Sequence, residues 1–219
     1  MRVLASLISV LFHPLMMLTY MLILMLAVNP FMFGYTRIAE ADTLILMVFL
    51  TSALIPLIAI LVMKGIGWVG SLQMPDRHER IGPYIVTGVL YLTLYLHLAK
   101  AKAFPQLLLI ATLGSVIALF AGFLFNNFRK VSMHATAAGG LIILSFLLYT
   151  TYSTPTFLIH LPGGADLECS TAAVLYTALL LGGMICSSRL IIQKHSPGEV
   201  YTGLVIGIAG MLASAITIG

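Results

Sequence analysis

Long apolar runs occupy most of the chain, and no other feature limits its possible folds so strongly. Several of them approach the roughly 20 residues that a helix needs to cross a bilayer. A helix pairs its backbone polar groups within itself, so it is the form in which such runs enter lipid. We therefore predict an all-α polytopic membrane protein with six to seven transmembrane helices and a single integral membrane domain, residues 1–219. The runs cover about Leu4–Val28, Leu44–Met63, Pro83–Ala99, Phe104–Phe125, Ala135–Tyr152, Thr171–Ser187 and Val200–Ile218.

Two interruptions in this pattern carry predictions of their own. The pair His13-Pro14 falls near the start of the first run, where it predicts either a kink or a short entry helix. The stretch Ser153–Ser170 contains two prolines and a glycine pair and has no helical pattern, so we predict the longest loop there.

Charged residues make up only 8% of the chain, against 60% hydrophobic residues. The formal net charge of +4 fits a partner that is anionic, either membrane lipid or a small substrate. Because such a chain has little surface outside the membrane, we expect no nucleic-acid partner.

The charges concentrate in three polar segments: the first (Lys64–Arg80), the second (Asn126–His134) and the third (Ser188–Glu199). Two predicted spans separate each segment from the next, so all three emerge on the same face of the membrane. Eight of the 11 Lys and Arg residues lie on that face, which the positive-inside rule would assign to the cytoplasm. Basic residues that hold a ligand are not free topology signals, however, and the membrane side therefore stays open.

Several basic residues of these segments lie close to predicted helix starts. A helix start exposes unpaired N–H groups and the positive end of a dipole, which favours an anion. Ser132 is the predicted N-cap of the fifth span. The guanidinium groups of Arg77, Arg80 and Arg189 match phosphate oxygens in geometry, and Lys130 adds a further positive charge. An anionic phosphate group is the ligand that this arrangement suits best.

Two histidines add chemistry that binding alone does not need. His134 and His195 each lie beside a helix start in basic surroundings, where one imidazole can act as a nucleophile and the other can lend a proton. Glu199 follows His195 by four residues and could orient its ring, as the carboxylate of a catalytic triad does. Ser196 and Glu199 also form a capping-box pattern, S-x-x-E, on which Glu199 would cap the helix and never touch His195.

The three segments together resemble the motifs of the type 2 phosphatidic acid phosphatase (PAP2) superfamily. The third segment reads S-R-x5-H-x3-E, which is similar to the family's third motif, S-R-x5-H-x3-D. Ser132-Met133-His134 resembles the second motif, P-S-G-H, and Arg77–Pro83 is a degenerate likeness of the first, K-x6-R-P. The likeness covers about residues 64–219, so a PAP2-like helical bundle is expected there.

The resemblance implies a role for each matching residue. His195 would attack phosphorus to give a phosphohistidine, Glu199 would orient it, and His134 would protonate the leaving alkoxide. Arg189, Arg80 and Ser132 would hold the phosphate oxygens, without a metal or another cofactor. The implied activity is that of a lipid phosphatase or phosphotransferase in a bacterial inner (cytoplasmic) membrane. Its partners would be membrane lipids and a lipid phosphate substrate of the phosphatidate, phosphatidylglycerol phosphate, polyprenyl phosphate or lipid A type.

Departures from the family pattern keep a second interpretation open. Gln73 stands where the first motif has its lysine, and Arg77 is the predicted replacement. Met133 replaces the small glycine of the second motif, and Glu199 replaces the aspartate of the third. The alternative is a catalytically inactive PAP2-like protein that binds or transports anionic lipid.

Overall fold

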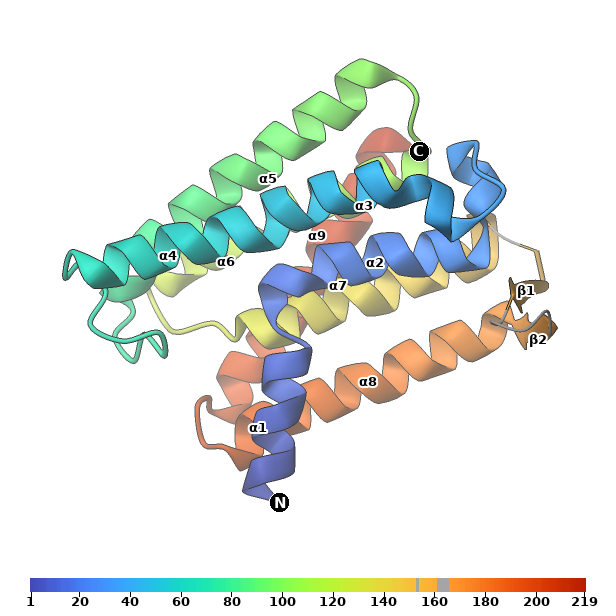
Figure 1. Ribbon diagram of the computed structural model, residues 1–219. Helices are drawn as coiled ribbons and strands as arrows, with labels where there is room; N and C mark the ends of the chain where they lie inside the picture. Colours follow the sequence, from blue (N-terminus) through green and yellow to red (C-terminus); the bar gives the residue numbers. More distant parts are fainter. Residues whose placement is uncertain (153, 161–165) are drawn as a thin grey trace.

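The computed structural model describes residues 1–152, 154–160 and 166–219. The chain is an all-α polytopic membrane protein in which long apolar helices form one bundle (Figure 1). Six helices are long and apolar enough to cross a membrane within the described residues, and a bent pair at the N-terminus would make a seventh span. The α-helices are α1 (Arg2–Leu11), α2 (Pro14–Val28), α3 (Asp42–Phe49), α4 (Ile55–Gly65), α5 (Ile81–Ala101), α6 (Gln106–Asn126), α7 (Met133–Leu147), α8 (Thr171–Ile191) and α9 (Pro197–Ile218).

Each predicted apolar run is helical, but the first is broken where the sequence has His13-Pro14. Helices α1 and α2 are bent by 63° at this point. Proline fits the first position of a helix because its missing N–H has no partner there anyway, and Pro14 begins α2 in this way. The predicted single run is therefore a short entry helix followed by a longer one.

The span that contains α3 and α4 continues through a π-helical turn, Leu50–Leu54. Pro56 follows this turn and has no N–H to donate to the carbonyl four residues before it, at Ser52. The hydroxyl of Tyr91 on α5 donates to that carbonyl at 3.2 Å. A neighbouring helix thus satisfies the polar group that the proline frees, as buried backbone in lipid requires.

The predicted long loop contains a short hairpin that the sequence analysis did not predict. Strands β1 (Thr156–His160) and β2 (Asp166–Ser170) pair antiparallel, with Thr156 opposite Ser170. The hairpin lies at the end of the bundle away from the connections α4–α5, α6–α7 and α8–α9 (Figure 1).

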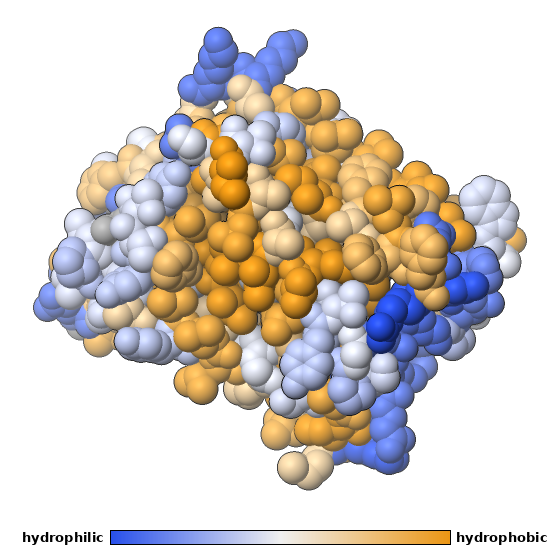
Figure 2. All heavy atoms as spheres, turned by 180° about the vertical axis from the view of Figure 1, so that it is seen from behind, coloured by the Kyte–Doolittle hydropathy of each residue, from blue (hydrophilic) through white to orange (hydrophobic). Residues whose placement is uncertain are grey.

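The outer surface is strongly apolar between two polar ends. Large hydrophobic side chains such as Leu180, Val205 and Ile216 are exposed on the described helices. Figure 2 shows apolar side chains covering the middle of one face, with hydrophilic residues gathered toward its ends. This distribution suits a lipid-exposed belt, because lipid solvates such side chains as well as a protein core does.

Helix α9 packs closely against α7 through glycines. A Cβ on Gly207 would collide with the backbone of Thr136, and one on Gly203 would collide with the carbonyl of Ser132. Small residues at such crossings let two helix backbones approach closely. The crossing sets the start of α7 against the start of α9, where most of the candidate site lies.

Gly207→Ala is therefore expected to lower the free energy of unfolding by about 3 kcal/mol, the upper end of the cost of overpacking. Gly183→Ala is the matched control, because no heavy atom lies within 4 Å of a Cβ at Gly183. The control should change stability by no more than about 1 kcal/mol, in the stabilising direction, because alanine favours the helix. Unfolding of both variants in detergent measures the difference, and equal effects would contradict the close crossing.

Candidate functional site

The three polar segments meet at one end of the bundle, as their predicted position on one membrane face requires. The amide of Ser132 in the second segment donates to the carbonyl of Glu199 in the third at 3.2 Å. Arg80 of the first segment donates through Nη1 to the carbonyl of Val131 at 3.2 Å. Asn126 donates through Nδ2 to the carbonyl of Arg77 at 2.9 Å. Each segment is therefore hydrogen-bonded to another.

The end of α8 determines where His195 lies. Gln193 adopts a left-handed conformation with φ of 55°. Its amide donates to the carbonyl of Leu190 at 2.9 Å, and the amide of Lys194 donates to the carbonyl of Arg189 at 3.2 Å. These two bonds form a Schellman motif, which ends the helix and reverses the chain. Arg189 thus lies in the last turn of α8, and His195 follows in the turn between α8 and α9.

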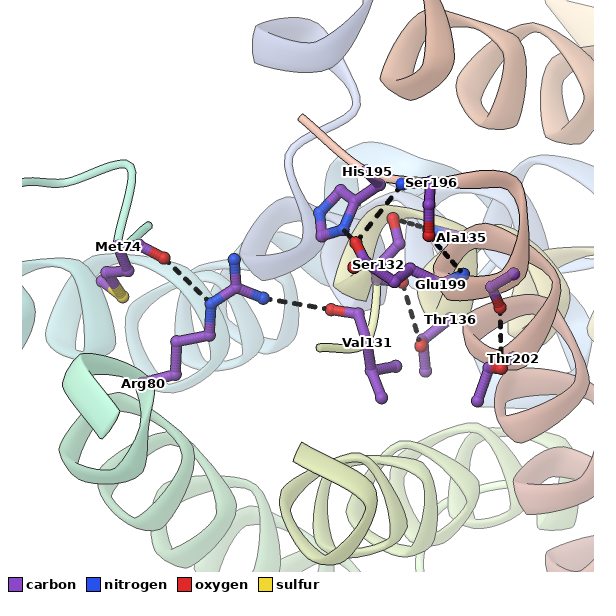
Figure 3. Close-up of polar contacts among 11 residues, drawn as sticks. Met74, Arg80, Val131, Ser132, Ala135, Thr136, His195, Ser196, Glu199 and Thr202 are labelled. Carbon is purple, nitrogen blue, oxygen red and sulfur yellow. Dashed lines mark hydrogen bonds and ion pairs between the residues drawn. The ribbon is translucent and has the colours of Figure 1, made fainter. Parts of the chain in front are cut away.

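Glu199 both caps α9 and binds His195. Its amide donates to Ser196 Oγ at 3.4 Å, and its Oε2 accepts the Ser196 amide at 3.4 Å, which completes a capping box. The same Oε2 lies 2.8 Å from His195 Nδ1 (Figure 3). Helix α9 begins at Pro197, so the two residues do not share a helix face; the capping geometry turns the carboxylate back toward the ring. The two interpretations of Glu199 are therefore compatible.

The contact with Glu199 leaves His195 Nε2 as the nitrogen that is free to react. A carboxylate accepts from Nδ1–H, so the neutral ring carries its lone pair on Nε2. The side chain of His195 is only 5% exposed, and this burial lowers its pKa to about 4. Glu199 raises that pKa, whereas the positive charges of Arg189 and Arg80 lower it further.

The pKa of His195 predicts how activity depends on pH. Because it falls from 6.5 to about 4, the ring stays neutral and nucleophilic at every pH above about 4. We expect the acidic limb of kcat/KM, corrected for ionisation of the substrate phosphate, to lie near pH 4, because this parameter reports the free enzyme. A pH profile of phosphate release measures it. An acidic limb near pH 6.5 would contradict the burial of a neutral nucleophile.

Arg80 and Arg189 bring two positive charges close to His195, and neither forms an ion pair among the described residues. Arg80 is held by the carbonyls of Met74 and Val131, through Nε at 3.1 Å and Nη1 at 3.2 Å (Figure 3). Arg189 Nε is buried and has no hydrogen-bond partner among the described residues. No carboxylate in the described part of the chain lies within ion-pair distance of either guanidinium group. Buried donors and charges require partners, so this geometry favours an anionic ligand between them.

Ser132 begins α7, as the sequence predicts. Its Oγ accepts the amide of Ala135 at 3.4 Å, and the residue is fully buried. The hydroxyl hydrogen of an N-cap serine is still available to donate. The first turn of α7 also carries His134, so a phosphate at this helix start would lie near both residues.

His134 contacts the N-terminal part of the chain, which the sequence analysis left out of the site. Its Nε2 lies 2.9 Å from the carbonyl oxygen of Ser9 in α1. Its ring also meets that of His13 edge to face, with centroids 5.6 Å apart and planes at 80°. No motif pointed to Ser9, and the only signal for His13 was the predicted break at Pro14.

The remaining predicted phosphate ligands have different surroundings. Arg77 Nη1 donates to the carbonyls of Asn127 and Phe128 at 2.9 and 3.1 Å. The contacts of the described residues thus tie Arg77 to the turn between α6 and α7, and not to Arg189 or either histidine. Lys130 lines an open pocket that His195 and Lys194 also line.

Lys194 contacts Gln73, the residue that the resemblance aligns with the lysine of the first motif. Its Nζ donates to Gln73 Oε1 at 2.5 Å, so an ammonium group from the third segment reaches the position of the missing charge. Residues 73 and 194 are 121 positions apart, and nothing in the sequence linked them. Lys194, not Arg77, is the residue that the structure brings to this position.

This arrangement could perform nucleophilic displacement at phosphorus. It combines a buried neutral imidazole, a carboxylate on its Nδ1, two guanidinium groups that form no ion pair among the described residues, and a second histidine. Within the described ranges, no three His, Cys, Asp or Glu side chains group as metal ligands. Models of protein families, curated proteins and solved structures were all compared with the chain, and none of them matches it.

Proposed function

We propose that this protein is a PAP2-type lipid phosphatase of a bacterial inner membrane, which removes phosphate from a lipid through a phosphohistidine at His195. The observation that carries the proposal is the 2.8 Å contact between His195 Nδ1 and Glu199 Oε2, beside two guanidinium groups that form no ion pair within the described part of the chain. A structural histidine needs no such charge environment, whereas a phosphate nucleophile does.

The reaction would proceed in two displacements. His195 Nε2 forms a bond to phosphorus while the bond from phosphorus to the lipid oxygen breaks, and His134 gives a proton to that oxygen. Water then attacks phosphorus, its proton passes to His134, and the bond to His195 Nε2 breaks to release phosphate. Arg80 and Arg189 stabilise the negative charge that the phosphoryl oxygens carry in both steps.

A lipid substrate is supported by an apolar cavity that adjoins the start of α7. The cavity has a volume of about 60 Å³ and a mostly apolar lining, so it has room for part of a hydrocarbon chain and not for a whole one. Its walls come from α2, α5, α6, α7 and α9, and they include Met133 and Thr136 in the first turns of α7. A phosphate held by Arg189 and the start of α7 could therefore leave the first part of its hydrocarbon chain in an apolar space.

The experiment is phosphate release by the purified protein in detergent with a metal chelator present. The panel contains phosphatidate, phosphatidylglycerol phosphate, undecaprenyl phosphate and lipid A. We expect release from at least one of them, and we expect Arg189→Gln to lower kcat by about 10²–10³-fold, the usual cost of removing one oxyanion donor.

Arg37→Gln is the matched control, because Arg37 is exposed and precedes α3, outside the three polar segments. It should leave release unchanged. No release from the whole panel, together with tight binding of one of its lipids, would contradict the phosphatase and favour the anionic-lipid binder.

A further inference from the structure

Helix α1 is too short to cross a membrane and lies against α8 at the end of the bundle that carries the polar segments (Figure 1). Its 10 residues extend about 15 Å, half of the roughly 30 Å hydrocarbon thickness. Its outward face is apolar, whereas its inward face holds the small residues Ala5 and Ser9. Such a helix belongs in the membrane interface, with its apolar face in lipid. The outward residues are Val3, Leu4, Leu7, Val10 and Leu11.

The inward face of α1 is fixed to the candidate site by hydrogen bonds. Ser9 Oγ lies 3.1 Å from Ser188 Oγ, next to Arg189 on α8. The carbonyl oxygen of Ser9 lies 2.9 Å from His134 Nε2. A carbonyl oxygen only accepts, so His134 carries a proton on Nε2 in this arrangement. The bond joins residues 125 positions apart and fixes which nitrogen of His134 is occupied.

The contact has a clear physical cause. Helix α1 ends at Leu11, so the carbonyl of Ser9 is one of the last four that lack a partner within the helix. The C-terminal end of a helix carries partial negative charge and favours a cation beside it. Both the carbonyl and the helix end thus favour a proton on His134 Nε2, the nitrogen that faces α1.

His13 makes a second contact with the same imidazole. Its Nδ1 accepts the amide of Leu15 at 3.4 Å, which caps α2 and fixes the bend between α1 and α2. Its ring meets that of His134 edge to face at 5.6 Å. Two consecutive parts of the N-terminal segment, the end of α1 and the bend, therefore hold one functional side chain.

We propose that helix α1 is a positioning element for the proton donor: the Ser9 carbonyl holds His134 Nε2–H, and Nδ1 is the nitrogen that exchanges protons with substrate. This inference rests on the proposed function. Nδ1 takes up a proton when the phosphate anion of the substrate binds beside it, and the lipid oxygen receives this proton as its bond to phosphorus breaks. His134 then remains neutral, with Nε2–H still on Ser9, and it recovers an Nδ1 proton from the attacking water.

The test compares two substrates that differ only in whether the leaving atom needs a proton. The leaving group of dodecyl phosphate is an alkoxide, which needs a proton. The leaving group of S-dodecyl phosphorothiolate is a thiolate, which does not need a proton. Loss of a general acid should therefore slow the first substrate far more than the second. A change that merely damages the fold slows both alike.

Ser9→Leu is the main variant, because a bulky side chain at this buried position forces α1 away from α8. Its control is Val10→Leu, which introduces the same residue on the outward face, where Val10 is 75% exposed. A second variant deletes residues 2–11 and removes the carbonyl altogether. His134→Ala gives the reference signature, and His195→Gln reports on the proposed function itself.

We expect Ser9→Leu and the deletion to lower kcat for dodecyl phosphate by about 10²-fold, the lower end of general acid catalysis, with the phosphorothiolate rate within about threefold of wild type. Val10→Leu should match wild type on both substrates. Equal losses on the two substrates, or increased activity when α1 is released, would overturn the inference. If the wild-type protein is active and its activity depends on His195, the proposed function would still stand. Absence of any wild-type activity would instead contradict the proposed function.

Discussion

His195→Gln is expected to lower phosphate release from a lipid phosphate by at least about 10⁴-fold, because the loss of an enzyme nucleophile costs that much or more. Glutamine is of similar size and can still donate to Glu199, so the turn between α8 and α9 should keep its structure. What it lacks is the lone pair of Nε2, which the contact at 2.8 Å leaves free in the native protein. Initial rates with saturating substrate, in detergent with a chelator, measure the loss.

A second histidine and carboxylate pair provides the control. His78 Nδ1 lies 3.0 Å from Asp76 Oδ1, also among the polar segments, but the His78 side chain is 70% exposed. His78→Gln should leave the rate within about twofold, since surface ion pairs contribute little. If His195→Gln behaved like His78→Gln, the assignment of His195 as nucleophile would be wrong.

Glu199→Gln is the second variant with a large expected effect, because it separates the two contacts of this carboxylate. Glutamine also serves in a capping box, so the start of α9 should form as before. The neutral amide no longer balances the positive charge that develops on His195 when Nε2 attacks. We expect kcat to fall by about 10²–10⁴-fold, the range seen when the acid of a catalytic triad is neutralised or a general base is lost. The free energy of unfolding should change by less than about 1 kcal/mol.

Ser196→Ala tests the cap by itself. It removes the Oγ that accepts the Glu199 amide at 3.4 Å, and the loss of an N-cap serine costs about 1 kcal/mol of stability. The contact between His195 and Glu199 remains, so activity should stay within a few-fold of wild type. An active Glu199→Gln protein beside an inactive Ser196→Ala protein would mean that Glu199 acts only as a helix cap.

The fold was predictable from the sequence because every long apolar run has to become a helix in lipid. The exceptions are local. The bend at His13-Pro14 was predicted, but the contact that holds α1 against α8 was not, because Ser9 and Ser188 are 179 positions apart and no periodicity links them. The hairpin of β1 and β2 depends on pairing within a loop whose composition indicates only the absence of a helix.

The membrane face of the candidate site was also predictable, because counting spans brings the three polar segments together. The geometry within it was not. Glu199 Oε2 contacts both the Ser196 amide and His195 Nδ1. The sequence analysis treated the helix cap and the catalytic partner as alternatives and did not predict that one oxygen could be both. Arg77 was assigned by its spacing from Arg80, whereas Lys194 reaches Gln73 through the reversal that ends α8. Such a position depends on the path of the backbone and cannot be read from motif spacing.

The central claim is that phosphorus becomes covalently bound to His195, and trapping of the intermediate tests it most directly. The protein is incubated briefly with dodecyl phosphate carrying radioactive phosphorus, then quenched in alkaline detergent and digested. Phosphohistidine survives alkali and is lost in acid. We predict alkali-stable label on the peptide that contains His195, and none in the His195→Gln protein. Absence of label during active turnover, or label on any other residue, would contradict the account.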